Sequence, residues 1–365
     1  MSEISTIFDH GFFRGKKIFI TGHTGFKGSW LCQMLLLAGA DITGYALPPE
    51  GPENLYTITK LEQDIHSILA DIRDFDKLQK AIQTAKPDIL FHLAAQPLVS
   101  EGFSHPRETY ETNVMGTVNV LEALRYTPVR SSLIITTDKV YENREWLWGY
   151  RENERLNGTD PYSNSKSCAE LLTWSYQKAF FNQSAPDQSI TAISTARAGN
   201  VIGGGDFAPN RIVPDCVRAA RNHQPIAVRH PHSIRPYQHV LEALDAYLQI
   251  AAYQYSDSTY ADSYNVGPDE QDCLTTRQLV EYFCQSWGEG LTWQDVSQND
   301  TIPEANYLKL DCTKLKQRLA WQPHWDVQTA VQKTIDWTKD YLAGKDMKNC
   351  MQTQIKDYWT ERKEP

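Results

Sequence analysis

The sequence predicts an α/β fold in which a doubly wound parallel sheet is followed by a smaller C-terminal lobe. Over residues 1–197, short runs rich in β-branched residues alternate with longer segments of helical period. A glycine-rich turn joins the first of these runs to the first helical segment. Strands separated by crossover helices form βαβ units, and such units build a parallel sheet that is covered on both faces.

The predicted elements can be placed in order along the chain. Gly39 follows the first helical segment as a C-terminal capping glycine would, and Asp74 precedes another as an N-cap. Strands are expected at 17–21, 41–46, 88–93, 132–136 and 190–197, and helices at 26–37, 74–85, 107–124, 162–181, 238–253 and 276–287.

The amino-acid composition changes after residue 198. Glycine and proline cluster there, and arginines, histidines and aromatic residues follow. We expect residues 1–197 to form a nucleotide-type domain, to which residues 236–268 return. Residues 198–235 and 269–340 are expected to form the second lobe, which closes a cleft over the first. The polar C-terminal tail, 341–365, could be a terminal helix or a frayed segment.

Composition limits the classes of function. The 365 residues are 41% hydrophobic, enough for one large core or two smaller ones, and the net charge of −9 argues against a dedicated nucleic-acid binder. No secretory signal is recognisable in residues 1–13, and apolar runs such as 35–38 are too short to span a bilayer. The seven cysteines form no CxxC pair. We therefore expect a cytoplasmic protein with free thiols, without a metal site, nucleic-acid partner or membrane partner.

The glycine-rich turn indicates a site for a dinucleotide. The run 17–21 leads directly into Gly22-His23-Thr24-Gly25-Phe26-Lys27-Gly28, and a helical segment continues from there. Glycines let the backbone approach a pyrophosphate, and a helix N-terminus favours negative charge. The spacing is GxxGxxG instead of GxGxxG, and a tight turn without a ligand is the alternative. In this position, the turn predicts a Rossmann-type domain that binds a nicotinamide dinucleotide.

The end of the second predicted strand bears on which dinucleotide binds. An acid there would hold the ribose 2′-hydroxyl of NAD, and an arginine there would suit the 2′-phosphate of NADP. The strand ends in Tyr45-Ala46-Leu47 with neither residue, and NAD is favoured over NADP. Asp71, followed by Ile72, is a candidate for contacting the adenine, and an ordinary turn aspartate is the alternative.

Three copies of a Tyr-x-x-x-Lys pattern occur in the chain. A lysine one helical turn from a tyrosine can lower the pKa of the phenol, which then accepts a proton from a substrate hydroxyl. The copies begin at Tyr56, Tyr162 and Tyr341. Tyr56 lies in an expected loop and Tyr341 lies in the polar tail. Only the pair Tyr162 and Lys166 begins a long helical segment, so we assign the chemistry to this pair.

The residues around this pair resemble the sugar-nucleotide 4,6-dehydratases of the extended short-chain dehydrogenase/reductase superfamily. The discriminating stretch is 136–141, where an acid and a second ionisable group, Asp138 and Lys139, follow the hydroxyl of Thr137. Dehydratases specific for dTDP-glucose and GDP-mannose carry Glu at the second place, and a lysine there is similar to the CDP-glucose 4,6-dehydratases. Stretches 21–30, 160–166, 197–206 and 233–240 resemble the same group, with Phe207 and Tyr237 where tryptophan is common.

The resemblance implies three coupled steps with no net redox change. Tyr162 removes the proton of the sugar C4 hydroxyl, which Thr137 also binds, while hydride passes from C4 to NAD. Lys166 binds the nicotinamide ribose and lowers the pKa of Tyr162. Asp138 then protonates the departing C6 hydroxyl while Lys139, in its neutral form, removes the C5 proton. The return of hydride to C6 gives a 4-keto-6-deoxy sugar.

Further contacts follow from the same resemblance. Asn113 would hold backbone groups near the site, and Arg211 and Arg235 would bind the substrate pyrophosphate, with ordinary ion pairs as the alternative. His92 is more suited to a structural role. The other expected substrate contacts are Gln96, Asn200 and Tyr237. The expected cofactor contacts are Gly22, His23, Thr24, Gly25, Phe26, Lys27, Gly28, Asp71, Ile72, Leu93, Ala94, Ala95, Thr136, Tyr162 and Lys166. Such enzymes are also expected to form homodimers or homotetramers.

Two other readings remain open. A sugar-nucleotide 4-epimerase would use the same tyrosine, threonine and NAD, but epimerisation has no elimination step that needs Asp138 and Lys139. A non-catalytic NAD-sensing module could keep the glycine-rich turn without Thr137, Tyr162 and Lys166. The choice of CDP over another nucleotide is implied by the resemblance alone, and a 4,6-dehydratase for a different nucleotide sugar is a further alternative.

Overall fold

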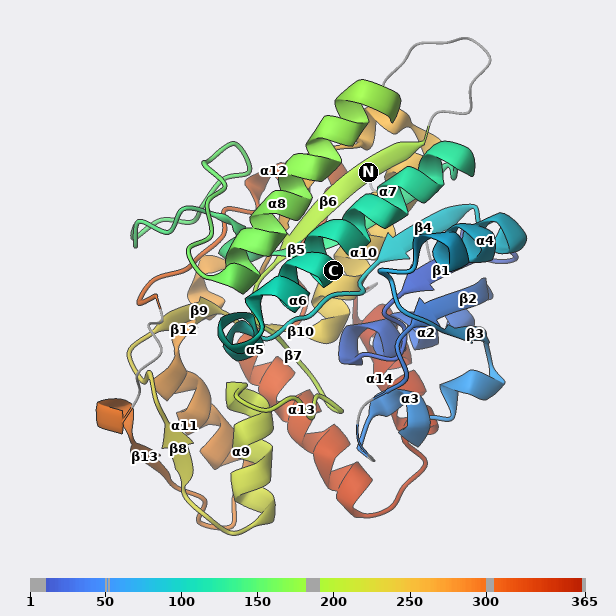
Figure 1. The fold of residues 1–365 in the computed structure, drawn as a ribbon. Coiled ribbons are helices and arrows are strands. Elements are labelled where there is room, and N and C mark those ends of the chain that lie inside the picture. Colours follow the sequence, from blue (N-terminus) through green and yellow to red (C-terminus); the bar gives the residue numbers. More distant parts are fainter. Residues whose placement is uncertain (1–10, 50, 52, 182–190, 300–304, 363–365) are drawn as a thin grey trace.

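A seven-stranded parallel sheet forms the centre of the protein in a computed structural model, which describes residues 11–362 apart from 50, 52, 182–190 and 300–304 (Figure 1). The strand order reverses between β1 and β4, so the predicted doubly wound sheet is confirmed. Ligands of such sheets bind at this reversal, beyond the carboxyl ends of the strands. In spatial order the strands are β11 (Ser263–Val266), β6 (Ala192–Ala198), β5 (Ser131–Thr137), β4 (Ile89–His92), β1 (Lys17–Thr21), β2 (Asp41–Ala46) and β3 (His66–Leu69).

Helices cover both faces of the sheet (Figure 1). Successive side chains of a strand point to opposite faces, so Ile18 and Ile20 join one core cluster and Phe19 joins the other. The first face carries α2 (Phe26–Leu37), α10 (Val240–Ser256) and α14 (Met347–Glu361), and the second carries α4 (Phe75–Ala85), α7 (Gly116–Tyr126) and α8 (Pro161–Tyr176).

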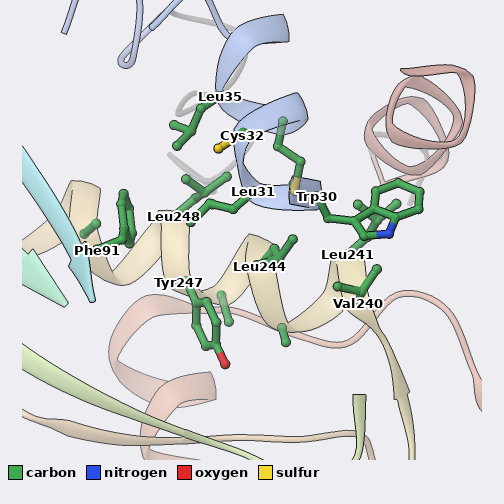
Figure 2. Packing of buried hydrophobic residues seen from close by; sticks show 14 of the residues in the cluster. Trp30, Leu31, Cys32, Leu35, Phe91, Val240, Leu241, Leu244, Tyr247 and Leu248 are labelled. Atoms are coloured by element: carbon green, nitrogen blue, oxygen red, sulfur yellow. The ribbon is translucent and has the colours of Figure 1, made fainter. Parts of the chain in front are cut away.

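The packing of α2 on α10 fixes the helix that follows the glycine-rich turn (Figure 2). Leu31 of α2 meets Leu244 and Leu248 of α10, and each of these side chains is fully buried. Burial of a leucine side chain stabilises a fold by about 1.5–3 kcal/mol. This contact therefore sets where the amino end of α2 lies relative to the sheet.

The second lobe has a core of its own, made by residues such as Val213, Leu279, Phe283 and Val331. The short parallel pair β7 (Val201–Ile202) and β10 (Gln238–His239) connects it to the large sheet. Its other elements are α9 (Ile212–Arg221), α11 (Thr276–Trp287), α13 (Val327–Leu342), β8 (Ile226–Val228), β13 (Trp293–Asp295), β9 (Ile234–Pro236) and β12 (Cys273–Thr275).

The helix predicted over 107–124 is not continuous. Helix α6 (Pro106–Tyr110) passes into a π-helical turn, Glu111–Met115, before α7 begins. The helix predicted over 162–181 likewise ends as α8 at Tyr176, and a second π-helical turn, Gln177–Phe181, follows. Wide turns of this kind give no signal in the apolar pattern, which still repeats at helical spacing on each side.

The C-terminal segment forms a helix in the part that the structure describes. Met351, Ile355 and Tyr358 of α14 are fully buried in the core that includes α2 and α10. The remaining short helices are α3 (Leu55–Ile58), α5 (Val99–Ser104) and α12 (Thr313–Leu319). Within the described residues, no helix has the length and apolar character needed to cross a bilayer.

Candidate active site

The turn between β1 and α2 is built for close approach of a ligand. Gly22 has a φ of +81°, and a β-carbon there would lie 2.7 Å from the backbone nitrogen of Ala94, so only glycine fits. Gly25 caps α2 without a side-chain hydrogen bond to the helix, and α2, which is described throughout, has no acid in its first turn. The first N–H groups of α2 therefore remain available to an anion, as a dinucleotide pyrophosphate requires.

Two side chains of this turn are occupied by the protein itself. The His23 ring is buried, with Nε2 at 2.7 Å from Ser67 Oγ, and burial lowers the pKa of His23 to about 4. The Thr24 hydroxyl donates to the Leu47 carbonyl at 3.0 Å. A contact of His23 or Thr24 with the cofactor would thus come from their backbones.

Beyond β4, small residues lie against the glycine-rich turn, where the backbone of Ala94 faces Gly22. The Thr21 hydroxyl accepts hydrogen bonds from the backbone nitrogens of Leu93 and Ala94, each at 3.1 Å, which holds the chain of β4 against β1. His92 is buried between Thr21 and Thr117, and burial lowers its pKa to about 3. His92 is therefore a neutral structural residue, as expected.

Asp71 and Ile72, the expected adenine contacts, lie after β3. The Asp71 carboxylate pairs with Arg73 at 2.6 Å, and this hydrogen bond lowers the pKa of Asp71. The Tyr45 hydroxyl donates to the Asp71 carbonyl at 2.9 Å, which fixes the turn. Ile72 is buried against Gly116. A contact of Asp71 with adenine remains a prediction.

Helix α8 presents Tyr162 and Lys166 one turn apart. Asp160 caps its amino end by accepting a hydrogen bond from the Ser163 backbone at 3.0 Å, and Pro161 occupies the first turn. Lys166 Nζ donates to the Ile135 carbonyl of β5 at 3.1 Å. Burial lowers the pKa of Lys166 to about 8, against the opposing effect of a nearby carboxylate on α8.

The pKa of Tyr162 is raised, and the predicted lowering by Lys166 is wrong in this geometry. Burial raises it to about 12, and the groups that oppose burial are a hydrogen bond with Thr137 and the charge of Arg211. The Lys166 ammonium is held by the Ile135 carbonyl instead. The structure therefore joins Tyr162 to Thr137 and to a residue of the second lobe.

Thr137, Asp138 and Lys139 follow one another where β5 ends. The Thr137 hydroxyl donates to Asp138 Oδ1 at 3.0 Å, and the Lys139 backbone nitrogen lies 3.4 Å from the Thr137 hydroxyl. Asp138 is 1% exposed, and its Oδ2 has no hydrogen-bond partner among the described residues. Burial raises the pKa of Asp138, opposed first by the charge of Lys139. Burial thus shifts this carboxyl group toward its protonated form, which is the form that can donate a proton.

Both arginines expected to bind the substrate act on this cluster. Arg211 forms an ion pair with Asp206 at 2.9 Å and lowers the pKa of Tyr162. Arg235 is 2% exposed, donates to the Ile234 carbonyl at 2.8 Å, and its charge opposes the raised pKa of Asp138. The structure therefore brings the second lobe to Tyr162 and Asp138.

The other three expected substrate residues are held by the protein. The Gln96 side chain donates to the Thr109 hydroxyl at 2.8 Å. The Tyr237 hydroxyl lies 3.2 Å from that of Thr276, and Tyr237 is buried. The Asn200 carbonyl accepts a hydrogen bond from the Gln238 backbone at 3.0 Å. Of the three, Asn200 is the one whose side chain has no hydrogen bond to the described residues.

A buried ion pair behind the site was not predicted from the sequence. Glu170 and Arg197 are 2.8 Å apart, with side chains 1% and 3% exposed. The Thr136 hydroxyl donates to Glu170, so its side chain, expected at the cofactor, faces this pair. Glu170 lies one helical turn beyond Lys166, and this spacing was the feature of the sequence that could have pointed to Glu170. The pair fixes α8 against β5 and β6.

Asn113 connects the loop after β4 to α8. Its side-chain oxygen accepts a hydrogen bond from the Gln96 backbone nitrogen at 2.8 Å, and its nitrogen donates to the Ser165 hydroxyl at 2.9 Å. Ser165 precedes Lys166, so this link holds the backbone beside the catalytic candidates. The role expected for Asn113, holding backbone groups near the site, matches these contacts.

Comparison with known proteins adds independent information. A sequence model of the family described as GDP-mannose 4,6-dehydratase matches residues 19–334. The CDP-glucose 4,6-dehydratase of Salmonella typhimurium is 44% identical over 96% of this chain and 98% of its own length. A probable dTDP-glucose 4,6-dehydratase of Sinorhizobium fredii is 25% identical over 88% of this chain and 92% of its own length.

Solved structures share the fold. The UDP-glucose 4-epimerase of Stenotrophomonas maltophila has a TM-score of 0.78 at 18% identity, covering 90% of this chain and 99% of its own. That of Thermus thermophilus, solved with NAD, has a TM-score of 0.74 at 21% identity, covering 88% of this chain and 98% of its own. These similarities confirm the predicted Rossmann-type fold, and the sequence matches decide the family. The chain belongs to the GDP-mannose 4,6-dehydratase family, and the sequence-based prediction of a sugar-nucleotide 4,6-dehydratase is confirmed.

Proposed function

We propose that this protein is a hydro-lyase that converts CDP-glucose into CDP-4-keto-6-deoxyglucose with bound NAD. The observation that carries the proposal is Asp138, a buried carboxyl group with a raised pKa beside Thr137. Elimination of water needs such a proton donor, whereas epimerisation at C4 does not. The 44% identity with a CDP-glucose 4,6-dehydratase supports the choice of nucleotide.

The cleft at the sheet reversal fits NAD. The turn Gly22–Gly28 and the free N–H groups of α2 would hold its pyrophosphate, and Lys166 would donate hydrogen bonds to its nicotinamide ribose. The adenine would lie by Asp71 and Ile72, and residues 93–95 would line the opposite wall. When bound, NAD would supply the hydride acceptor for oxidation at C4 and the hydride donor for reduction at C6.

Tyr162 and Thr137 would act on the C4 hydroxyl. Tyr162, as the phenolate, takes the proton of this hydroxyl, and the Thr137 side chain orients the same oxygen. Because burial raises the pKa of Tyr162, the phenolate needs nearby positive charge, and Arg211 supplies part of it. The ammonium of Lys166 lies on the same helix and adds positive charge to the site.

Asp138 and Lys139 would carry out the elimination. The 4-keto group acidifies the C5 hydrogen, Lys139 in its neutral form removes it, and Asp138 protonates the departing C6 hydroxyl. The bonds broken are C5–H and C6–O, and the product of this step is water and a C5–C6 double bond. Consecutive residues at a strand end can reach two sides of one sugar ring.

The second lobe would hold the rest of the substrate. Arg211 and Arg235 supply positive charge for the diphosphate, and Asn200 offers a side chain without a hydrogen bond to the described residues. Gln96 and Tyr237 would shape the sugar pocket. On this view residues 1–197 and 236–268 bind the cofactor, and residues 198–235 and 269–340 bind the nucleotide sugar.

The function can be tested with a panel of CDP-, dTDP-, UDP- and GDP-glucose. The 4-keto-6-deoxy product develops near-UV absorbance in alkali, and we expect it from CDP-glucose with NAD present. The matched control is Tyr162→Phe, which should give no signal. Formation of a C4 epimer without this absorbance would overturn the proposal in favour of an epimerase.

We further propose that two copies of the chain associate through the outer surface of α7 and α8. Leu171 and Trp174 of α8 are 53% and 61% exposed, and Met115, in the π-helical turn that leads into α7, is 50% exposed. Large apolar side chains gathered in this way are typical of a subunit interface. Light scattering should show a dimer or a tetramer, and Trp174→Glu should shift it to a smaller species. A wild-type monomer would contradict this.

We also propose that the protein works in the cytoplasm. All seven cysteines are free thiols, and Cys32, Cys216 and Cys312 are buried. Proteins of reducing compartments keep their cysteines in this form.

A further inference from the structure

Lys27 is an unusual residue at its position. It lies in the first turn of α2, where the helix dipole disfavours a cation. Its side chain is half-buried, and its ammonium forms no hydrogen bond or ion pair with the residues that the structure describes. A half-buried cation without a protein partner at the amino end of a helix is unfavourable, which indicates that an anionic ligand completes its surroundings.

The backbone near Lys27 is pressed against the start of the second lobe. A β-carbon at Gly203 would lie 3.2 Å from the Phe26 ring, and Trp30 Nε1 donates to the Gly204 carbonyl at 3.0 Å. The same loop continues to Asp206, which holds Arg211. The first turn of α2 and the loop that carries Arg211 are therefore packed together.

Positive charge exceeds negative charge around Lys27. Burial lowers the pKa of Lys27 to about 8, and the next contributions come from Arg211 and Lys166. Of the two carboxyl groups that oppose them, Asp206 is already paired with Arg211, and burial raises the pKa of Asp138. Cations that approach one another in a site of low polarity repel, and an anion between them removes the repulsion.

We propose that Lys27 and Arg211 together bind a phosphate of the substrate diphosphate, one cation from each lobe. The proposal rests on the proposed function only in taking a nucleoside diphosphate sugar as the ligand. It moves Lys27 from the cofactor, where the sequence placed it, to the substrate. The dinucleotide pyrophosphate has the backbone N–H groups of α2, whereas Arg211 belongs to the second lobe.

Binding of non-reacting ligands tests this assignment without turnover. The nucleoside diphosphate bound most tightly by the wild-type enzyme is first selected calorimetrically from CDP, UDP, dTDP and GDP. Lys27→Met should lower the affinity for this diphosphate by about 10- to 100-fold, the usual loss for a charged hydrogen bond. The affinities for the bare nucleoside and for NAD+ should change by less than about twofold. Lys27→Arg should restore most of the affinity, and Lys80→Met, an exposed lysine on α4, should change nothing.

A double-mutant cycle of Lys27→Met and Arg211→Met tests whether both cations bind the same phosphate. We expect the double variant to lose less affinity than the product of the two single losses, because each cation acts on the other through the shared anion. Near-UV circular dichroism checks that each variant is folded.

Several outcomes would overturn the proposal. If Lys27→Met lowers the affinity for NAD+ and leaves the affinity for the diphosphate unchanged, Lys27 binds the cofactor. Unchanged affinities for both, or a wild-type enzyme that binds none of the four diphosphates, would also reject it. A wild-type enzyme that binds a diphosphate but forms no keto product would refute the proposed function and leave this binding test intact.

Discussion

The same Tyr-x-x-x-Lys spacing occurs in two regions of the large domain, with different results. On α8, Tyr162 meets Thr137, and Lys166 is buried against a strand carbonyl. Near α3, the Tyr56 hydroxyl donates to Ser67 Oγ at 2.8 Å, and Lys60 lies beyond the helix with a φ of +51°. The spacing therefore places two groups together only where a helix continues through both.

In a third copy, near the C-terminus, the helix also ends before the lysine, because α13 stops at Leu342. The Tyr341 ring stacks on Trp337, its hydroxyl donates to Glu53 at 3.1 Å, and Lys345 pairs with Asp340 at 2.6 Å. Both ends of this pattern already have protein partners. What distinguishes α8 is a neighbouring strand end that supplies Thr137 and Asp138.

The largest expected effect comes from removing the distinctive phenol. Tyr162→Phe should lower kcat by about 10³-fold, within the range for loss of a general base with its substrate hydrogen bond, while NAD+ affinity stays within about threefold. Tyr56→Phe and Tyr341→Phe are the matched controls and should keep kcat within about twofold, since neither hydroxyl meets Thr137. A comparable loss in either control would show that the wrong pair was chosen.

The second prediction concerns Asp138, at the strand end beside α8. Asp138→Asn keeps the shape but removes the acid, so kcat should fall by about 10²-fold or more. Elimination should slow more than oxidation, and stopped flow should then show the near-UV band of reduced nicotinamide accumulating after mixing with substrate. A slow variant without this band would place Asp138 at or before hydride transfer.

The third prediction concerns the pH dependence of NAD+ affinity, which we expect Lys166 to control and the other two lysines not to affect. Burial lowers the pKa of Lys166 to about 8, and the charged ammonium donates a stronger hydrogen bond to a ribose hydroxyl than the neutral amine does. NAD+ affinity should therefore be full below pH ~8 and fall by about tenfold over the next unit or so. Lys166→Arg should flatten this profile, whereas Lys345→Met should leave it unchanged. Lys27→Met should also keep the slope, because we assign Lys27 to the substrate.

The smallest effect is expected where the tyrosine is structural. Tyr56 is buried, with its ring at 5.5 Å from the His23 ring and its hydroxyl on Ser67, so Tyr56→Phe removes one hydrogen bond below the glycine-rich turn. The free energy of unfolding should fall by about 1 kcal/mol in urea titrations. No loss of stability would indicate that water replaces the phenol without cost.

Local pattern explains which parts of the fold were predictable. The strands 17–21 and 41–46 and the helices 26–37 and 276–287 agree with β1, β2, α2 and α11 in their bounds, because apolar spacing and flanking turns agree there. The Glu170–Arg197 pair was missed, since it joins a helix to a strand that is distant in sequence. The sign of the Tyr162 pKa shift was missed because burial depends on the assembled cleft.

The π-helical turn at Glu111–Met115 makes this stretch of chain intolerant of length changes. Asn113 must face Gln96 and Ser165, while Val120 and Leu124 of the following helix must face the sheet. Each residue of an α-helix advances about 100°, so deleting one residue here would rotate one set away from its partners by that angle. A one-codon deletion between residues 111 and 115 should therefore separate folding from activity, and recovering both would require a compensating insertion before α7.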